Sequence, residues 1–197
     1  MLKRIGPRAF ENQFNPSAHS AAAHERSMIP NDIYTNTLKQ INVWLPFYKS
    51  ECVKEKLSGL KVLLASTDVH EHGLLLVHKL LEAAGVSVVS LGAERNPDEV
   101  VSEAARAAAE IIFISTHNGM ALDYARALFD EMEEQNYTAP VCMGGVLNQN
   151  TDGCTVPVDV SRDLEEMGIA IVTDLALLPE KAFLLMQSNG KCGHRPR

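Results

Sequence analysis

Cysteine, basic residues and long apolar runs are all scarce in this 197-residue chain, and each shortage excludes a class of protein. The cysteines stand far apart with no Cys-x-x-Cys pair, which argues against a disulfide scaffold or a structural zinc knuckle; they are Cys52, Cys142, Cys154 and Cys192. Eighteen basic residues against 25 acidic ones give a net charge of −7, so no basic stripe is available for a nucleic-acid backbone. No run is long enough to span a bilayer, and the basic start lacks the apolar segment of a secretory signal. We therefore expect a soluble, cytoplasmic protein whose partners are neither nucleic acid nor membrane.

The hydrophobic content of 46% is sufficient for one core, and the pattern divides the chain into three parts. Residues 1–58 read as an arm of about 30 residues followed by one or two helices, which Pro46 interrupts and which pack on the main domain or on a partner. Residues 59–190 form the main domain, and residues 191–197 a flexible tail. Trp44 is expected to be a packing anchor of the helical extension.

Short, continuously apolar runs alternate with helical patterns after residue 59. Such runs predict strands buried on both faces, and the alternation predicts a doubly wound α/β domain with a five-stranded parallel sheet. The predicted strands cover residues 61–66, 86–91, 111–115, 140–143 and 169–172. The predicted helices cover residues 74–84, 98–110, 122–136, 161–167 and about 179–187. The segment between the fourth strand and the short helix at 161–167 reads as a polar loop.

Several chemistry-bearing residues follow the predicted strands. Right-handed crossovers bring the carboxyl ends of all these strands to one edge, where open α/β sheets bind ligands. Asp68 and His70 are two residues apart in a turn, so the carboxylate can accept the Nδ1 hydrogen and leave Nε2 free to bind a metal. Gly73 allows a close backbone approach, while Gly144 and Gly145 would open a slot that the Ser115 hydroxyl could enter.

Other interpretations of the same residues are open. His72, His78 and His117, taken singly, can be ordinary solvated histidines. His70 and His72 also form the His-x-His of a metal hydrolase, for which His117 and Asp174 would have to supply the remaining ligands. A phosphoacceptor domain is excluded because no aspartate ends the third strand, and the absence of Gly-x-Gly-x-x-Gly and of a P-loop argues against nucleotides.

The motifs at this edge, taken together, resemble those of the cobalamin (vitamin B12)-binding domains of mutases and methyltransferases. The chain carries Asp68-Val-His70-Glu-His-Gly73 after the first strand, Ser115-Thr-His117 after the third and Gly144-Gly145 after the fourth. The resemblance implies a Rossmann- or flavodoxin-like sheet of strand order 2-1-3-4-5. It also implies that the corrinoid tail leaves the cobalt and that His70 replaces it as the lower axial ligand. The remaining cofactor-binding residues would be Asp68, Glu71, Gly73, Ser115, Thr116, His117, Gly144 and Gly145.

The sequence departs from that family pattern in two places. His117 stands where the family often has leucine, and residues 172–175 replace a glycine-rich turn after the fifth strand. We therefore expect more polar surroundings for the tail at His117, and contacts after the fifth strand that differ from those of the family.

The resemblance also implies a partner, because a chain of this length has no room for a substrate-binding barrel. We expect the cobalamin-carrying subunit of an adenosylcobalamin-dependent mutase, inactive without a large substrate-binding subunit. The alternatives are a corrinoid protein that carries methyl groups on cobalt for a methyltransferase, a B12 carrier or sensor, and the metal hydrolase. A homo-oligomer is also left open.

Overall fold

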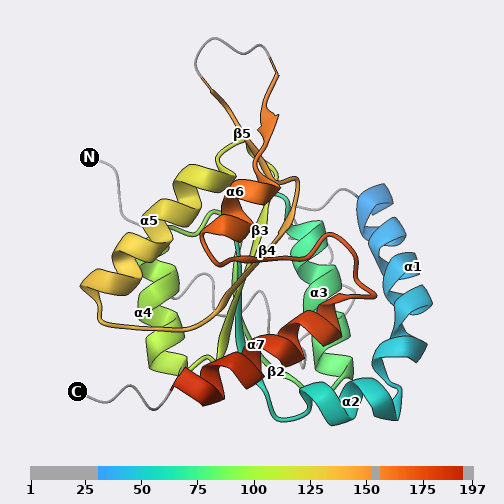
Figure 1. Ribbon diagram of the computed structural model, residues 1–197. Coiled ribbons are helices and arrows are strands. Elements are labelled where there is room, and N and C mark those ends of the chain that lie inside the picture. The colour runs from blue at the N-terminus through green and yellow to red at the C-terminus, as the bar shows by residue number, and fades with distance from the viewer. Residues whose placement is uncertain (1–30, 152–155, 193–197) are drawn as a thin grey trace, which may run out of the picture.

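The computed structural model describes residues 31–151 and 156–192 (Figure 1). The predicted arm, residues 1 to about 30, and most of the predicted tail lie outside these ranges. Within them, a parallel sheet is covered by helices on both faces, as the alternation of apolar runs and helical patterns predicted.

The central sheet has five parallel strands in the order β2-β1-β3-β4-β7, which confirms the predicted order when β7 is counted as the fifth strand of the sheet. The strands are β1 (Lys61–Ser66), β2 (Ser87–Gly92), β3 (Ile111–Thr116), β4 (Val141–Gly145) and β7 (Ala170–Ile171). Parallel pairing of β1, β3 and β4 sets Ser66, Ser115 and Gly144 side by side. The residues that follow these three strands therefore meet at one edge of the sheet.

Alternate residues of each strand enter two separate hydrophobic clusters. In β1, Leu63 and Ala65 pack with α4 (Pro97–Ala107), α5 (Ala121–Glu134) and α6 (Ser161–Glu166), while Val62 and Leu64 face the other layer. That other layer contains α3 (Glu71–Ala83) and α7 (Leu178–Cys192), together with α1 (Asn31–Tyr48) and α2 (Glu51–Leu57). Figure 1 shows the two sets of helices on opposite sides of the sheet. Burial on both faces explains why the strands read as continuous apolar runs.

Capping residues, prolines and glycines in the sequence predict most helix ends to within a few residues. Asn96 forms a capping box with Glu99 and Pro97 opens α4, one residue before the predicted start at residue 98. Gly85 follows α3 with a φ of +84°, the left-handed conformation expected after a helix end. The predicted start of α3 at residue 74 was too late, because the helix begins at Glu71. His72 and Gly73 therefore belong to its first turn and not to the preceding loop.

The two N-terminal helices pack on the main domain. α1 lies along α3, and the fully buried Tyr48 donates a hydrogen bond of 2.7 Å to the Leu175 carbonyl beyond β7. Trp44 packs against the hydrophobic cluster that contains Tyr48, as expected of a packing anchor. The prediction that Pro46 interrupts the helix is wrong, because α1 continues past this proline to Tyr48. A proline this close to the end removes a backbone donor without ending the helix.

Two further segments differ from the sequence prediction. The supposed polar loop after β4 contains a small antiparallel pair, β5 (Asn148–Gln149) with β6 (Val158–Asp159), which rises beyond the edge of the sheet (Figure 1). Strands of two residues are too short to show a period of two in the sequence. The last helix, α7, extends to Cys192, so the first two residues assigned to the tail are helical.

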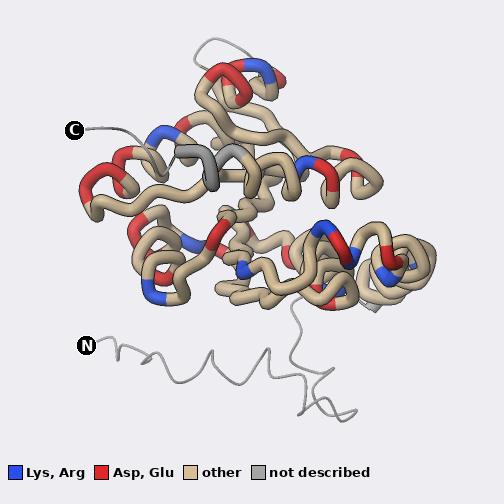
Figure 2. Tube along the Cα trace, turned by 60° about the horizontal axis from the view of Figure 1, so that its bottom comes forward, with Lys and Arg blue, Asp and Glu red and all other residues tan. Residues whose placement is uncertain are grey.

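Charged residues lie mainly on the outer helices. Figure 2 shows Lys and Arg scattered among Asp and Glu along the described part of the chain. Many are paired within one helix, such as Lys79 with Glu82 and Arg106 with Glu103. In the described ranges, no helix has both the length and the apolar character needed to cross a membrane.

Candidate functional site

Asp68 and His70 form the centre of the site at the carboxyl edge of the sheet. The Asp68 Oδ1 atom accepts hydrogen bonds from the backbone N–H of His70 at 2.8 Å and from its Nδ1 at 2.9 Å. Asp68 is only 8% exposed, whereas the side chain of His70 is 51% exposed. The buried carboxylate thus fixes the ring and its tautomer, and leaves Nε2 free, which is the arrangement expected for a metal-binding histidine.

The same carboxylate joins two loops. Its Oδ2 atom accepts the backbone N–H of His117 at 2.6 Å. Sequence reasoning missed this bond, although the strand register explains it. Ser66 pairs with Ser115, so Asp68 and His117, each two residues further on, lie opposite each other. Burial raises the pKa of Asp68, but the hydrogen bonds from His70 and His117 outweigh it and hold that pKa below its ordinary value.

His117 lies close to two glycines of the predicted signature. A Cβ added at Gly145 would come within 2.8 Å of its Cε1, and one added at Gly73 would come within 4.0 Å of the same atom. Its Nδ1 is buried and has no hydrogen-bond partner among the described residues. Burial lowers the pKa of His117; Asp68 opposes this effect, and His70 and His72 add to it. The net effect favours the neutral form of this imidazole.

The two neighbouring glycines of β4 meet different constraints. A Cβ at Gly144 would lie 2.5 Å from the Val172 carbonyl oxygen, so glycine there permits the close approach of the chain beyond β7. Gly145 has a φ of +102°, and a Cβ would lie 2.3 Å from the Thr116 carbonyl oxygen. The slot expected at this glycine pair is therefore filled. Backbone carbonyl groups occupy the space beside both glycines, and the His117 ring also lies beside Gly145. Gly73 is less tightly constrained, because an added Cβ would make only ordinary contacts, at 3.5 Å with Ser115 Oγ and at 4.0 Å with His117 Cε1.

The other predicted site residues lie nearby with different surroundings. Ser115 is half-buried at the end of β3, and its Oγ faces Gly73. Thr116 is fully buried, and its hydroxyl bonds to that of Thr67 at 2.9 Å, so it joins the two loops. Glu71 lies in the first turn of α3, where burial raises its pKa. Ser115 is thus accessible from the space beside α3, while Thr116 is occupied within the loops.

Gln149 and Met120 shape the rim of the site and were not predicted. The Gln149 side-chain oxygen accepts the backbone N–H groups of Leu122 and Asp123 at the start of α5, at 3.0 and 3.2 Å. Met120 pairs with Gln149 through an isolated β-bridge. These contacts hold the β5–β6 segment against the loop that carries His117. A two-residue strand gives no sequence signal for them.

The rim of the site is apolar and exposed. Val69, Met120 and Val146 follow β1, β3 and β4 and are 46%, 50% and 48% exposed. Three large apolar side chains around one polar centre are typical of a surface that binds an apolar ligand or a partner protein.

The metal-ligand set suggested for a hydrolase forms only in part. Asp68, His70 and His117 offer ligand atoms that all lie within 4.8 Å of one another. Asp174 does not join them, because it accepts the backbone N–H of Ala176 at 2.8 Å in its own turn. Of the ligands that the hydrolase interpretation requires, His70 and His117 therefore come together beside Asp68, whereas Asp174 lies apart from them.

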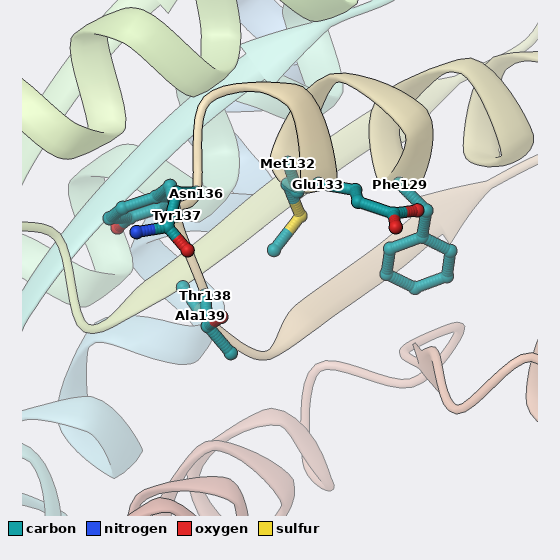
Figure 3. A pocket seen from close by; sticks show the side chains of 7 residues that line it. All are labelled: Phe129, Met132, Glu133, Asn136, Tyr137, Thr138 and Ala139. Atoms are coloured by element: carbon teal, nitrogen blue, oxygen red, sulfur yellow. The ribbon is translucent and has the colours of Figure 1, made fainter.

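A pocket far from this edge has no part in the site (Figure 3). It lies between the end of α5 and the segment that enters β4, at the opposite end of that strand from Gly144 and Gly145. The lining residues are Phe129, Met132, Glu133, Asn136, Tyr137, Thr138 and Ala139. It contains no histidine, and Glu133 is its one charged residue.

Comparison with known proteins supports the resemblance that the motifs indicate. The family model described as the B12 binding domain matches residues 61–172, which is more than half of the chain. Glutamate mutase sigma subunit 1 of Haloarcula marismortui is 28% identical over 123 residues, 62% of this chain and 80% of that protein. The 2-hydroxyisobutanoyl-CoA mutase small subunit of Aquincola tertiaricarbonis is 26% identical over 99 residues, 49% of this chain and 73% of that protein.

Solved structures share the fold at lower identity. The monomethylamine corrinoid protein of Methanosarcina barkeri superposes with a TM-score of 0.54 at 22% identity, over 74% of this chain and 65% of that one. A cobalamin-binding protein from Desulfitobacterium hafniense DCB-2 gives 0.51 at 23% identity, over 62% and 57%. This chain thus spans less than two thirds of either structure. With the family model covering the whole sheet, the signature residues at its edge and the same fold in these structures, the chain belongs to the B12-binding domain family.

Proposed function

We propose that the chain binds cobalamin with its nucleotide tail displaced and with His70 as the lower ligand of the cobalt. The observation that carries the proposal is the bond between Asp68 Oδ1 and His70 Nδ1, which leaves Nε2 of the half-exposed His70 ring free to bind a metal. Two oxygen acceptors of one buried carboxylate hold the His70 ring and the His117 loop in fixed positions. His70 is thereby oriented before any ligand arrives.

The residues around His70 fit a bound corrinoid. Gly73 puts no side chain between the start of α3 and Ser115, and we place the nucleotide tail beside these two residues. Val69, Met120 and Val146 offer apolar surface to the corrin ring. When bound, cobalamin supplies a reactive cobalt–carbon bond, and the chain itself holds, orients and shields that group. His117 is the one poorly fitting residue, since its ring already lies beside Gly145.

We further propose that the chain is the cobalamin-carrying subunit of an adenosylcobalamin-dependent mutase. The chain matches 80% of the glutamate mutase sigma subunit and 73% of the 2-hydroxyisobutanoyl-CoA mutase small subunit, both of which are separate small subunits. The matched domain supplies no substrate-binding barrel, so a large subunit would provide the substrate site. The exposed apolar rim is the surface such a subunit would cover.

A corrinoid protein of a methyltransferase is the second candidate. Its support is the fold shared with the monomethylamine corrinoid protein and with a chain of the methanol:cobalamin methyltransferase complex of Methanosarcina barkeri, at TM-scores of 0.54 and 0.52. This chain covers only 65% and 52% of those chains. A tagged chain recovered from its native cells with a mutase large subunit would favour the first candidate, and recovery with a methyltransferase would favour the second.

The binding proposal is tested by absorption spectroscopy of the full chain titrated with adenosylcobalamin and with methylcobalamin. We expect the spectrum of a tail-displaced, histidine-ligated corrinoid for at least one of them. His70→Ala should abolish the histidine-ligated spectrum and weaken binding about tenfold or more, because it removes the ligand to cobalt. His78→Gln is the control and should bind normally, because His78 lies about two turns further along α3 than the signature residues and pairs with Glu82. Absence of binding by the wild-type chain would contradict the proposal.

Gly73→Ala tests where the tail lies. A methyl group there makes only an ordinary contact with Ser115 Oγ, and alanine is preferred to glycine within a helix by about 0.5–1 kcal/mol. The variant should therefore be at least as stable as the wild type. Its affinity for cobalamin should fall about tenfold, because the methyl group fills space between α3 and β3. Unchanged affinity in a stable variant would place the tail elsewhere.

A further inference from the structure

Three histidines converge at the edge of the sheet, and the proposed cobalt site uses only one of them. His70 follows β1, His72 lies in the first turn of α3, and His117 follows β3. The ring centroids are 5.4 Å apart for His70 and His117, 5.7 Å for His72 and His117, and 6.1 Å for His70 and His72. His72 and His117 are therefore left without a role in the proposed function.

The distances within this cluster are close to those of a metal site. The ligand atoms offered by Asp68, His70 and His117 lie within 4.8 Å of one another, while the His72 ring stands farther out, with its centroid 5.7 Å from that of His117 and 6.1 Å from that of His70. Nitrogens bound to zinc at about 2.0–2.1 Å with tetrahedral angles are roughly 3.4 Å apart, so His70 and His117 need only small side-chain rotations, and His72 a larger one, to bind the same ion. The Asp68 carboxylate already bonds to His70 Nδ1, which is how carboxylates orient histidines that bind zinc through Nε2.

The ring of His117 supplies an independent indication. Its Nδ1 is buried, yet no hydrogen-bond partner for it is found in the described part of the chain. A buried ring nitrogen without a partner is unfavourable unless a ligand engages that nitrogen itself. His117 is also tied to the site through its backbone, since its N–H bonds to Asp68 Oδ2. The ring is thus held next to His70 with part of its bonding capacity unused.

We propose that the cobalamin-free chain binds one divalent transition-metal ion, represented by Zn²⁺, through His70, His72 and His117. Asp68 keeps His70 oriented, and its negative charge partly balances that of the ion. Three imidazole ligands favour zinc and its neighbours over the oxygen-seeking magnesium and calcium. Because the ion takes the nitrogen that would bind cobalt, metal and cobalamin exclude each other. The metal site stands without the proposed function, and only the exclusion rests on it.

The experiment is calorimetric titration of Zn²⁺ into the full, chelator-treated chain. We expect one equivalent to bind to the wild type and to the control His78→Gln, whose ring pairs with Glu82 four residues further along α3. His117→Leu and His72→Gln should each weaken binding at least about tenfold, because each removes one of three ligands. Circular dichroism checks that each variant is folded, and His72→Gln in the first turn of α3 serves if His117→Leu is not.

The outcomes separate this inference from the proposed function. The absence of Zn²⁺ binding overturns the metal site. Binding that is the same in both folded variants and the wild type also overturns it, because the zinc would then be bound by other residues of the sequence. With Zn²⁺ bound, the apparent dissociation constant for adenosylcobalamin should rise about tenfold or more, and an unchanged value overturns the exclusion. A chain that binds cobalamin but no zinc contradicts this inference alone, and one that binds zinc but no cobalamin contradicts the proposed function alone.

Discussion

Replacing Gly145 by alanine is expected to lower the free energy of unfolding by about 3 kcal/mol. Gly145 has a φ of +102°, where a residue with a Cβ is strained. The added Cβ would also lie 2.3 Å from the Thr116 carbonyl oxygen and 2.8 Å from His117 Cε1. Thr116 is the register partner of Gly145 in the neighbouring strand, so the contact can be relieved only by separating the ends of β3 and β4.

Gly168→Ala is the matched control for this variant. Gly168 has a φ of +90°, but a Cβ there would meet nothing within 4 Å. Its replacement therefore costs only the backbone strain, about 1 kcal/mol. Urea denaturation of the wild type and both variants gives the comparison. If Gly145→Ala were no more destabilised than Gly168→Ala, the result would contradict the close approach of β3 and β4 at Gly145.

The Gly145 contact illustrates what the sequence could and could not predict. The five strands of the sheet were predictable, because burial on both faces makes Val62 to Ala65 and the runs like it continuously apolar. The glycine pair was recognised as a feature of the edge. That its space is filled by the Thr116 and Val172 carbonyls and by the His117 ring depends on the pairing of strands distant in the chain.

The same distinction applies to the polar centre of the site. The bond between Asp68 and His70 was predictable, since both residues lie in one turn. The bond from the His117 N–H to Asp68 was not, because it requires the register of β1 against β3. The β5–β6 pair was missed for another reason, since two-residue strands have no sequence period. Local geometry was thus readable from the sequence, and contacts set by strand register were not.

Asp68→Asn is expected to destabilise the chain by about 2–3 kcal/mol at neutral pH. Three N–H groups point at the carboxylate: the backbone and ring N–H of His70 bond to Oδ1, and the His117 backbone N–H bonds to Oδ2. An asparagine has one accepting oxygen, so its NH₂ group would face a donor at one side. Because Asp68 is only 8% exposed, water would compensate poorly.

Asp174→Asn is the control for the effect of charge alone. Asp174 is exposed and accepts one backbone N–H within its own turn, at 2.8 Å from Ala176, which an asparagine oxygen can still do. We expect its replacement to change the free energy of unfolding by less than about 0.5 kcal/mol. Equal effects of the two substitutions would contradict the assignment of Asp68 as the residue that holds two loops together.

The pH dependence of the Asp68 effect gives a second, independent readout. The pKa of Asp68 in the folded chain lies below its ordinary value, so the folded state binds this proton less readily than the unfolded state does. Its contribution to stability is therefore complete above the unfolded pKa of about 4 and is lost as the pH falls through the lower, folded pKa. The difference between wild type and Asp68→Asn should consequently be largest near neutral pH and shrink below pH of about 4, while the difference for Asp174→Asn stays small throughout.

The same substitution connects folding to ligand binding. Asp68 fixes the tautomer and direction of His70, so a folded Asp68→Asn chain should bind cobalamin about tenfold more weakly and with less of the histidine-ligated spectrum. His70→Ala, in contrast, removes the ligand and leaves the His117 N–H bonded to Asp68. It should therefore abolish the histidine-ligated spectrum with less loss of stability than Asp68→Asn. The opposite order of the two stability losses would mean that Asp68 serves His70 alone and does not tie β1 to β3.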